Sequence, residues 1–138
     1  AAALERRAAA AARLVQPVLE QPGMSGVKIL TLLGTHLIGT RLARAERDRA
    51  GGNISETRIA DAVYRLTVSA RPYGVRGYRE EAARWARWSA LWTARELRHA
   101  LRAALDADRA LKSTTVSDDR GILVQLVLGF AAMHREAA

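Results

Sequence analysis

The residue types best suited to acid–base or metal chemistry are widely separated in this chain. His36, His99 and His134 include no pair at the spacing that places two imidazoles on one face of a helix. Asp106 and Asp108 are close in sequence, but their carboxylates would point about 200° apart around a helix. They therefore cannot converge on one substrate as general acid and general base. We expect no catalytic residue, no metal ligand set and no cofactor in this chain.

A glycine-containing string, GTHLIGT, has a superficial likeness to a phosphate-binding loop. It lacks the lysine that reaches the phosphates in such loops. Gly34 and Gly39, its two glycines, weaken a helix by about 1 kcal/mol each relative to alanine. We therefore interpret them as positions where another element approaches the helix closely.

Arginines alternate with tryptophans in the region expected to form the fourth helix. Rings beside guanidinium groups can stack on the bases of single-stranded nucleic acid. The same spacing also suits a helix that buries large rings against a bundle, and we favour burial for Trp85 and Trp92. Trp88 lies slightly off that stripe, so it is the ring that we expect to find exposed. Together with Arg84 and Arg87, it is the candidate nucleic-acid contact.

The charge of the chain permits two interpretations. A net charge of +8 and a pI near 11.1 raise nucleic acid as a partner. Nearly all the positive charge is arginine, however, with lysine only at Lys28 and Lys112, and alanine is abundant. Such a bias can reflect a GC-rich genome. DNA contact therefore remains a possible function, and charge alone does not establish it.

Length and composition indicate one helical domain of a longer protein. The 138 residues have the length of a single domain. No cysteine is present, which excludes a disulfide scaffold and suits a cytoplasmic location. No apolar run approaches the ~20 residues that span a bilayer, so no membrane partner is expected. The chain does not begin with methionine, and we interpret residues 1–138 as a C-terminal fragment.

The hydrophobic pattern predicts an all-α fold, an irregular bundle of five or six helices. An alanine-rich first helix should be kinked or split at Pro17. Ser25 is expected to cap a second helix from Gly26 to about Ala50, and Ser55 to cap a third. The apolar side chains expected to face inward on the second and third helices are Val27, Leu30, Leu33, Leu37, Ile38, Leu42, Ile59, Val63 and Leu66.

A helix after Thr93 begins with a capping box. Thr93 can accept a hydrogen bond from the backbone N–H of Glu96, and Glu96 can accept one from that of Thr93. Asp108 lies in line with the leucines of this helix, four residues before Lys112. An unpaired buried carboxylate is costly. We therefore expect Asp108 to be partly buried and held by Lys112 or by an arginine of a neighbouring helix.

The last helix, expected from Ile122 to Met133, follows a polar loop over Ser113–Asp119 and is apolar on nearly every face. One bundle face cannot cover a helix of this kind. Excess apolar surface on a soluble chain marks an interface. Val124 and Leu128 are the candidates for contact with a partner.

The segment LRHALRAALDADRALKS, from Leu97 to Ser113, followed by a polar loop and an apolar helix, resembles the C-terminal end of the bacterial DNA polymerase III delta subunit. That subunit belongs to the clamp-loader family. Gln21 to Leu33 resembles the family's Gly-containing turn before a long helix. Arg71 to Val75, followed by Ala83 to Trp85, resembles its Pro–aromatic–Val entry to the next helix. The likeness covers most of this chain and corresponds to the last third of the family, the helical collar domain.

The resemblance implies a role in assembly. In this family the collar joins the other clamp-loader subunits in a ring, so that ATP-driven movements elsewhere open the sliding clamp for DNA replication. The sliding clamp itself is gripped by an N-terminal domain that this chain does not contain. The delta subunit does not hydrolyse ATP within the DNA polymerase III holoenzyme, so no enzyme activity is expected here. The alternatives are a free-standing basic helical module that binds DNA or RNA and, ranked last, a small helical enzyme.

Overall fold

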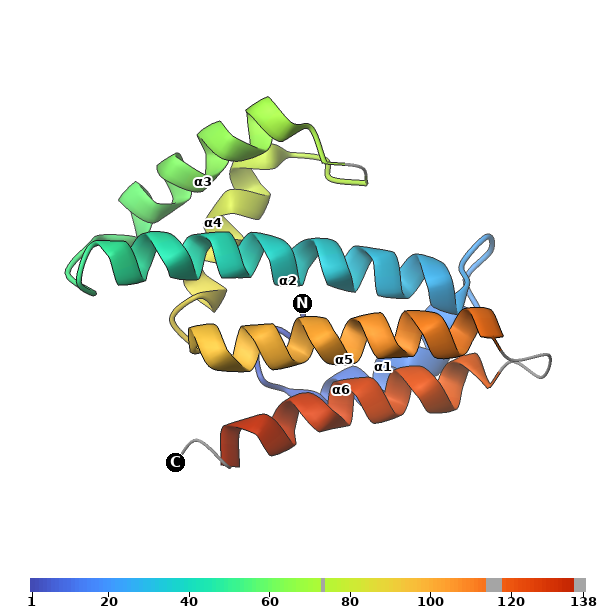
Figure 1. Cartoon of the computed structure of the whole chain (residues 1–138). Coiled ribbons are helices and arrows are strands. Elements are labelled where there is room, and N and C mark those ends of the chain that lie inside the picture. Colours follow the sequence, from blue (N-terminus) through green and yellow to red (C-terminus); the bar gives the residue numbers. More distant parts are fainter. Residues whose placement is uncertain (73, 114–117, 136–138) are drawn as a thin grey trace. The chain divides into compact units, whose positions relative to one another are not determined.

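The computed structural model describes residues 1–72, 74–113 and 118–135 of the chain (Figure 1). In these ranges all regular structure is helical, which confirms the prediction of an all-α fold with five or six helices. None of the helices described is long and apolar enough to cross a membrane. The six helices are α1 (Ala8–Leu19), α2 (Gly26–Arg49), α3 (Glu56–Ala70), α4 (Tyr78–Trp88), α5 (Ala94–Ser113) and α6 (Asp119–Arg135).

Two compact units divide the chain. Unit 1 consists of Ala1–Gly34 and Arg98–Ala138, and unit 2 is the continuous segment Thr35–Leu97. Helices α2 and α5 each contribute to both units. The single domain over residues 1–138 stays a prediction.

Unit 1 is built on the packing of α1 against α6. Val15 of α1 and Leu123 and Phe130 of α6 are buried. A guanidinium N–H of Arg6 donates to the Phe130 carbonyl oxygen at 3.1 Å, which ties the N-terminal turn to the last helix. Pro17 neither splits nor ends α1, because it lies in the last turn and the helix continues to Leu19.

Side-chain caps begin several of the helices. Ser25 and Ser55 accept hydrogen bonds from the N–H groups of Lys28 and Arg58, both at 3.3 Å, as predicted. In unit 1, Asp119 opens α6, and its carboxylate also accepts the N–H of Gly26 at 2.9 Å. One acid therefore serves the N-termini of two helices, where a negative charge is favoured.

Unit 2 is built on the packing of α3 against α4. Ile59 and Val63 of α3 are fully buried, as are Ala82 and Ala86 of α4. Trp85 of α4 is almost as deeply buried. These residues recur at helical spacing, so the apolar stripes that the sequence shows on α3 and α4 do form a core.

The predicted inward face of α2 is partly wrong. Leu30 and Leu37 are buried, but Ile38 and Leu42 are exposed. In unit 2 the buried face of α2 also carries the small residues Thr40 and Ala43. Thr40 lies on the side of α2 opposite Ile38 and Leu42, because successive helical residues are about 100° apart. Val27 on α2 and Leu66 on α3, also predicted to be inward, are exposed as well.

Candidate functional site

The arginine–tryptophan stretch of α4 does not form the stacking platform considered from the sequence. Trp85 is buried as predicted, but the prediction for Trp88 is wrong, since only 4% of its surface is exposed. α4 buries a broad face that includes both rings, so an offset from the stripe is not enough to expose Trp88. Arg84 and Arg87 are exposed, and Arg84 pairs with Glu81 at 2.8 Å. The two cations therefore face solvent without a tryptophan ring beside them for bases to stack on.

His36 of α2 belongs to a small polar cluster inside unit 2. The indole N–H of Trp85 donates to His36 Nδ1 at 3.1 Å. The nearest oxygen of Glu81 lies 3.7 Å from the same nitrogen and is buried without a hydrogen-bond partner in the described residues. Because Nδ1 accepts the indole proton, the neutral imidazole carries its own proton on Nε2.

Burial lowers the pKa of His36 below its ordinary value of 6.5. The charge of Glu81 opposes this shift, and Arg84 adds to it. The neutral form favoured by burial is also the form that can accept the Trp85 hydrogen bond. His36 is therefore a structural acceptor under ordinary conditions, a role that its spacing in the sequence did not reveal.

An apolar groove of about 420 Å³ lies among α2, α3 and α4 of unit 2. Its walls include Ile38 and Leu42 from α2 and Leu66 from α3. Gly39 and Trp85 also line it. A Cβ atom at Gly39 would overlap ring atoms of Trp85, so the indole occupies the space that glycine leaves. This contact confirms the sequence interpretation of Gly39 as a point of close approach, whereas Gly34 has no such neighbour.

The large apolar residues of this groove are evident in the sequence, but their helical spacing wrongly predicts that they are buried in the core. Ile38, Leu42 and Leu66 were expected in the core, and all three lie on an exposed wall. Ile38 and Leu42 lie one turn apart on α2. Their exposure can be recognised only when the buried face of α2 is known to include the small residues Thr40 and Ala43.

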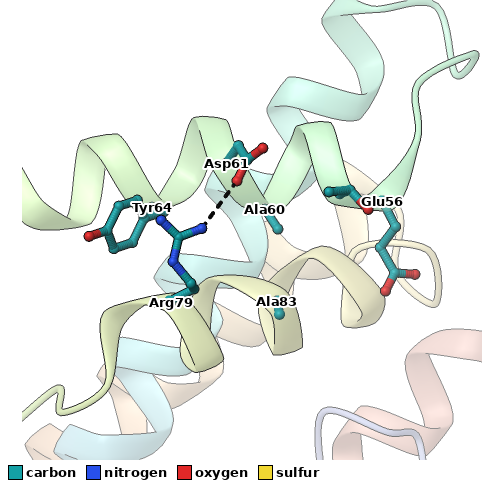
Figure 2. Close-up of a pocket in the computed structure, with 7 residues that line it drawn as sticks. Glu56, Ala60, Asp61, Tyr64, Arg79 and Ala83 are labelled. Carbon is teal, nitrogen blue, oxygen red and sulfur yellow. Dashed lines mark hydrogen bonds and ion pairs between the residues drawn. The ribbon is translucent and has the colours of Figure 1, made fainter.

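A second hollow, of about 210 Å³, lies between α3 and α4 and is lined by both charged and apolar residues. Figure 2 shows Arg79 of α4 beside Tyr64 and Asp61 of α3. Its guanidinium carbon lies 4.3 Å from the centre of the Tyr64 ring, and its Nη1 lies 3.5 Å from the Asp61 carboxylate. Glu56 also lines this hollow. Arg79 already has both a ring and a carboxylate as neighbours, so this hollow does not present a free cation to a ligand.

Metal binding has no support in the part of the chain that the structure describes. It contains no group of three or more His, Cys, Asp and Glu residues that could hold a metal ion. His36 is half-buried and His99 is exposed. The side chain of His134 lies outside the described residues.

The structural motif predicted for α5 forms as expected. The Thr93 hydroxyl accepts the Glu96 N–H at 3.2 Å, and the Glu96 carboxylate accepts the Thr93 N–H at 2.7 Å. Asp108 is paired with Lys112 at 2.6 Å, with 28% of the Asp108 side chain exposed. The carboxylate is therefore partly buried and held by the lysine, as the sequence indicated.

The two candidate interface residues of α6 differ in exposure. Val124 is half-buried, whereas 45% of Leu128 is exposed. Leu128 is therefore the one of the pair that a partner can reach.

Comparison with known proteins does not assign a family or a function to this chain. A scan against protein-family models, a search of curated proteins and a search of solved structures each give no match to the chain.

Proposed function

We propose that this chain is an assembly domain of the clamp-loader collar type, from a delta subunit of a bacterial DNA polymerase III. Its work would be to bind the corresponding helical domains of the other loader subunits. It would thereby support the loading of the sliding clamp in DNA replication. The resemblance of Leu97–Ser113 and the helix after it motivates this assignment.

The observation that carries the proposal is the exposed apolar surface of unit 1. On α6, Leu123 and Phe130 are buried, while Leu128 remains 45% exposed. The helix packed against it, α1, also carries an exposed leucine, Leu14. Burying a leucine side chain contributes about 1.5–3 kcal/mol. Because 45% of Leu128 is exposed, a partner that covers it would gain about half of this energy, roughly 3- to 10-fold in affinity.

A charge at Leu128 tests the proposal. Leu128→Glu should reduce co-purification with the collar domains of other loader subunits by roughly tenfold or more. Gln125→Glu is the matched control, because it adds the same charge at an exposed polar position of the same helix. Circular-dichroism melting should show that both variants remain folded. Equal recovery of wild type and Leu128→Glu would reject this interface.

The same proposal makes a prediction about the isolated chain. The family's clamp-gripping domain is not in this sequence, and no phosphate-binding loop was found in it. The chain should therefore neither hydrolyse ATP nor bind the sliding clamp. Clamp binding by residues 1–138 alone would overturn this division of labour.

Nucleic-acid binding is the second candidate function, and one observation favours it. Arg87 is exposed, and no carboxylate of the described residues lies within ion-pair distance of it. Fluorescence anisotropy with labelled single- and double-stranded oligonucleotides at several salt concentrations tests this function. Arg87→Glu should weaken any such binding. Binding that does not depend on salt would exclude the phosphate contacts that this function requires.

A further inference from the structure

We infer that the apolar groove of unit 2 is a docking site for an amphipathic helix of a partner protein, one with acidic residues beside its apolar face. This inference goes beyond the proposed assembly function, which was argued from α6 of unit 1. The groove is formed by residues of unit 2 alone.

The walls of the groove are apolar and open to solvent. Exposed fractions are 54% for Ile38, 40% for Leu42 and 47% for Leu66, so three large aliphatic side chains meet water at one place. Covering such side chains is favourable by about 25 cal/mol per Å². The nearby hydroxyl of Thr67 already donates to the Val63 carbonyl at 2.8 Å. The groove therefore favours an apolar occupant over a polar metabolite, which would need oriented polar partners.

The shape of the groove suits a helix. Two helices, α2 and α3, supply its walls, and Trp85 of α4 contributes a flat indole. Gly39 removes the side chain that would otherwise displace this indole. Apolar grooves between helices receive amphipathic helices through side chains at i, i+3, i+4 and i+7.

Three exposed arginines adjoin groove-lining residues in the chain and favour an acidic partner. Arg41 precedes Leu42, and Arg65 precedes Leu66. Arg71 lies between two further residues that line the groove. All three arginines are exposed, and none of the described carboxylates forms an ion pair with them. Glutamates or aspartates on the docking helix would supply the missing counter-charges and speed the encounter.

A second copy of this chain is a poorer occupant. The chain carries a net charge of +8, and pairing two copies through this groove would bring their arginines together. Like charges at an interface cost several kcal/mol. The net positive charge therefore favours a partner of opposite sign.

Synthetic peptides test this inference on the full chain. The probe is a fluorescein-labelled amphipathic peptide of roughly 18 residues, about five helical turns, with leucines on one face and glutamates beside them. One control peptide has the same composition in shuffled order, and another replaces each glutamate with lysine. In fluorescence anisotropy the acidic amphipathic peptide should bind at least about tenfold more tightly than either control.

Variants of the protein locate the binding site. Leu66→Glu should weaken binding of the acidic peptide by at least about tenfold. Val68→Glu is the matched control, because Val68 is an exposed valine of α3 outside the groove. Arg65→Glu leaves the apolar wall intact and should reduce the preference for the acidic over the lysine peptide. Circular dichroism should show that each variant remains folded.

Several results would overturn the inference. If the acidic and shuffled peptides bind equally tightly, the groove does not recognise an amphipathic helix. If the lysine peptide binds as tightly as the acidic one, the arginines do not select an acidic partner. Unchanged binding by Leu66→Glu would place the peptide elsewhere. Light scattering that shows a dimer dissociated by Leu66→Glu would assign the groove to a second copy. The Leu128→Glu assay concerns a different helix and unit, so failure here leaves the proposed assembly function to its own test.

Discussion

The contact between Gly39 and Trp85 gives a sharp test of the packing in unit 2. Gly39 lies inside α2, where alanine would stabilise the helix by about 1 kcal/mol if it fitted. It does not fit, because a Cβ atom there would overlap the Trp85 ring. Only 2% of Trp85 is exposed, so the indole is held by its surroundings. Gly39→Ala should therefore force the ring or the helix to move.

A matched substitution on the same helix isolates the size of this effect. Gly34 also lies inside α2, but a Cβ atom there would meet nothing within 4 Å. Gly34→Ala should stabilise the fold by up to about 1 kcal/mol through helix propensity alone. Gly39→Ala gains the same propensity but incurs an overpacking cost of about 1–3 kcal/mol. The difference between the two variants is therefore the overpacking cost itself.

Urea unfolding followed by circular dichroism measures this difference. With a denaturant slope of about 2 kcal/mol per molar urea, a cost of 2 kcal/mol separates the two midpoints by about 1 M. Trp85→Phe in the same background should reduce the penalty of Gly39→Ala, because the smaller ring leaves room. Equal midpoints for the Gly34→Ala and Gly39→Ala variants would refute the packing described here.

Three further substitutions test the polar contacts. Thr93→Ala removes the hydroxyl cap of α5 and should lower the free energy of unfolding by about 1 kcal/mol in thermal or urea melts. For Asp108→Ala, the sequence alone predicts a loss above ~0.5 kcal/mol; because the i,i+4 partner Lys112 is 60% exposed in the structure, we expect about 0.5 kcal/mol or less. Because burial lowers the pKa of His36 below 6.5, the unfolded chain binds its proton first as the pH falls. His36 should therefore destabilise the fold progressively below about pH 6.5. His36→Asn keeps an acceptor for Trp85 without titrating, so its melting temperature should fall less between pH 7.5 and 5.5.

Each of these expectations has an opposing result. A Thr93→Ala variant that melts with wild type would mean that the cap is dispensable. If Asp108→Ala lowers the free energy of unfolding by well over 1 kcal/mol, the Asp108 carboxylate contributes more than its surface ion pair with Lys112. Parallel pH profiles for wild type and His36→Asn would show that His36 titrates alike in the folded and unfolded chain.

Local signals in the sequence predicted the helices and their caps well. The hydroxyls of Ser25, Ser55 and Thr93 all cap the helices they were expected to begin. These contacts join residues three positions apart, so the nearby sequence contains both partners. The Asp108–Lys112 pair was predictable for the same reason, because the two residues lie one turn apart on α5.

The candidate sites depended on tertiary contacts and were harder to predict. Whether Trp88 or Ile38 faces solvent depends on which side of its helix a distant element covers. The buried face of α2 includes Thr40 and Ala43, which a search for large apolar residues does not select. The role of His36 required knowing that Trp85 of α4 would approach it. Hydrophobic periodicity therefore predicts the buried face of a helix correctly only when the residues that pack there are large and apolar.

The division of the chain into two units has a consequence for its synthesis. Unit 2 is a continuous segment, Thr35–Leu97, so it can close as soon as that segment leaves the ribosome. Unit 1 instead needs both ends, because Arg6 bonds to Phe130, 124 residues later in the chain. At a translation rate of about 5–20 residues per second, the interval between synthesis of α1 and synthesis of α6 is on the order of 6–25 s.

During that interval the apolar face of α1, including Val15, has no partner from α6. Exposed apolar segments of nascent chains aggregate or bind chaperones. Arrest-peptide force measurements on nascent chains of increasing length should detect folding of unit 2 first and a second event only after α6 emerges. A single event at full length would contradict this order. Slow translation or a shortage of chaperones should therefore damage unit 1 before it damages unit 2.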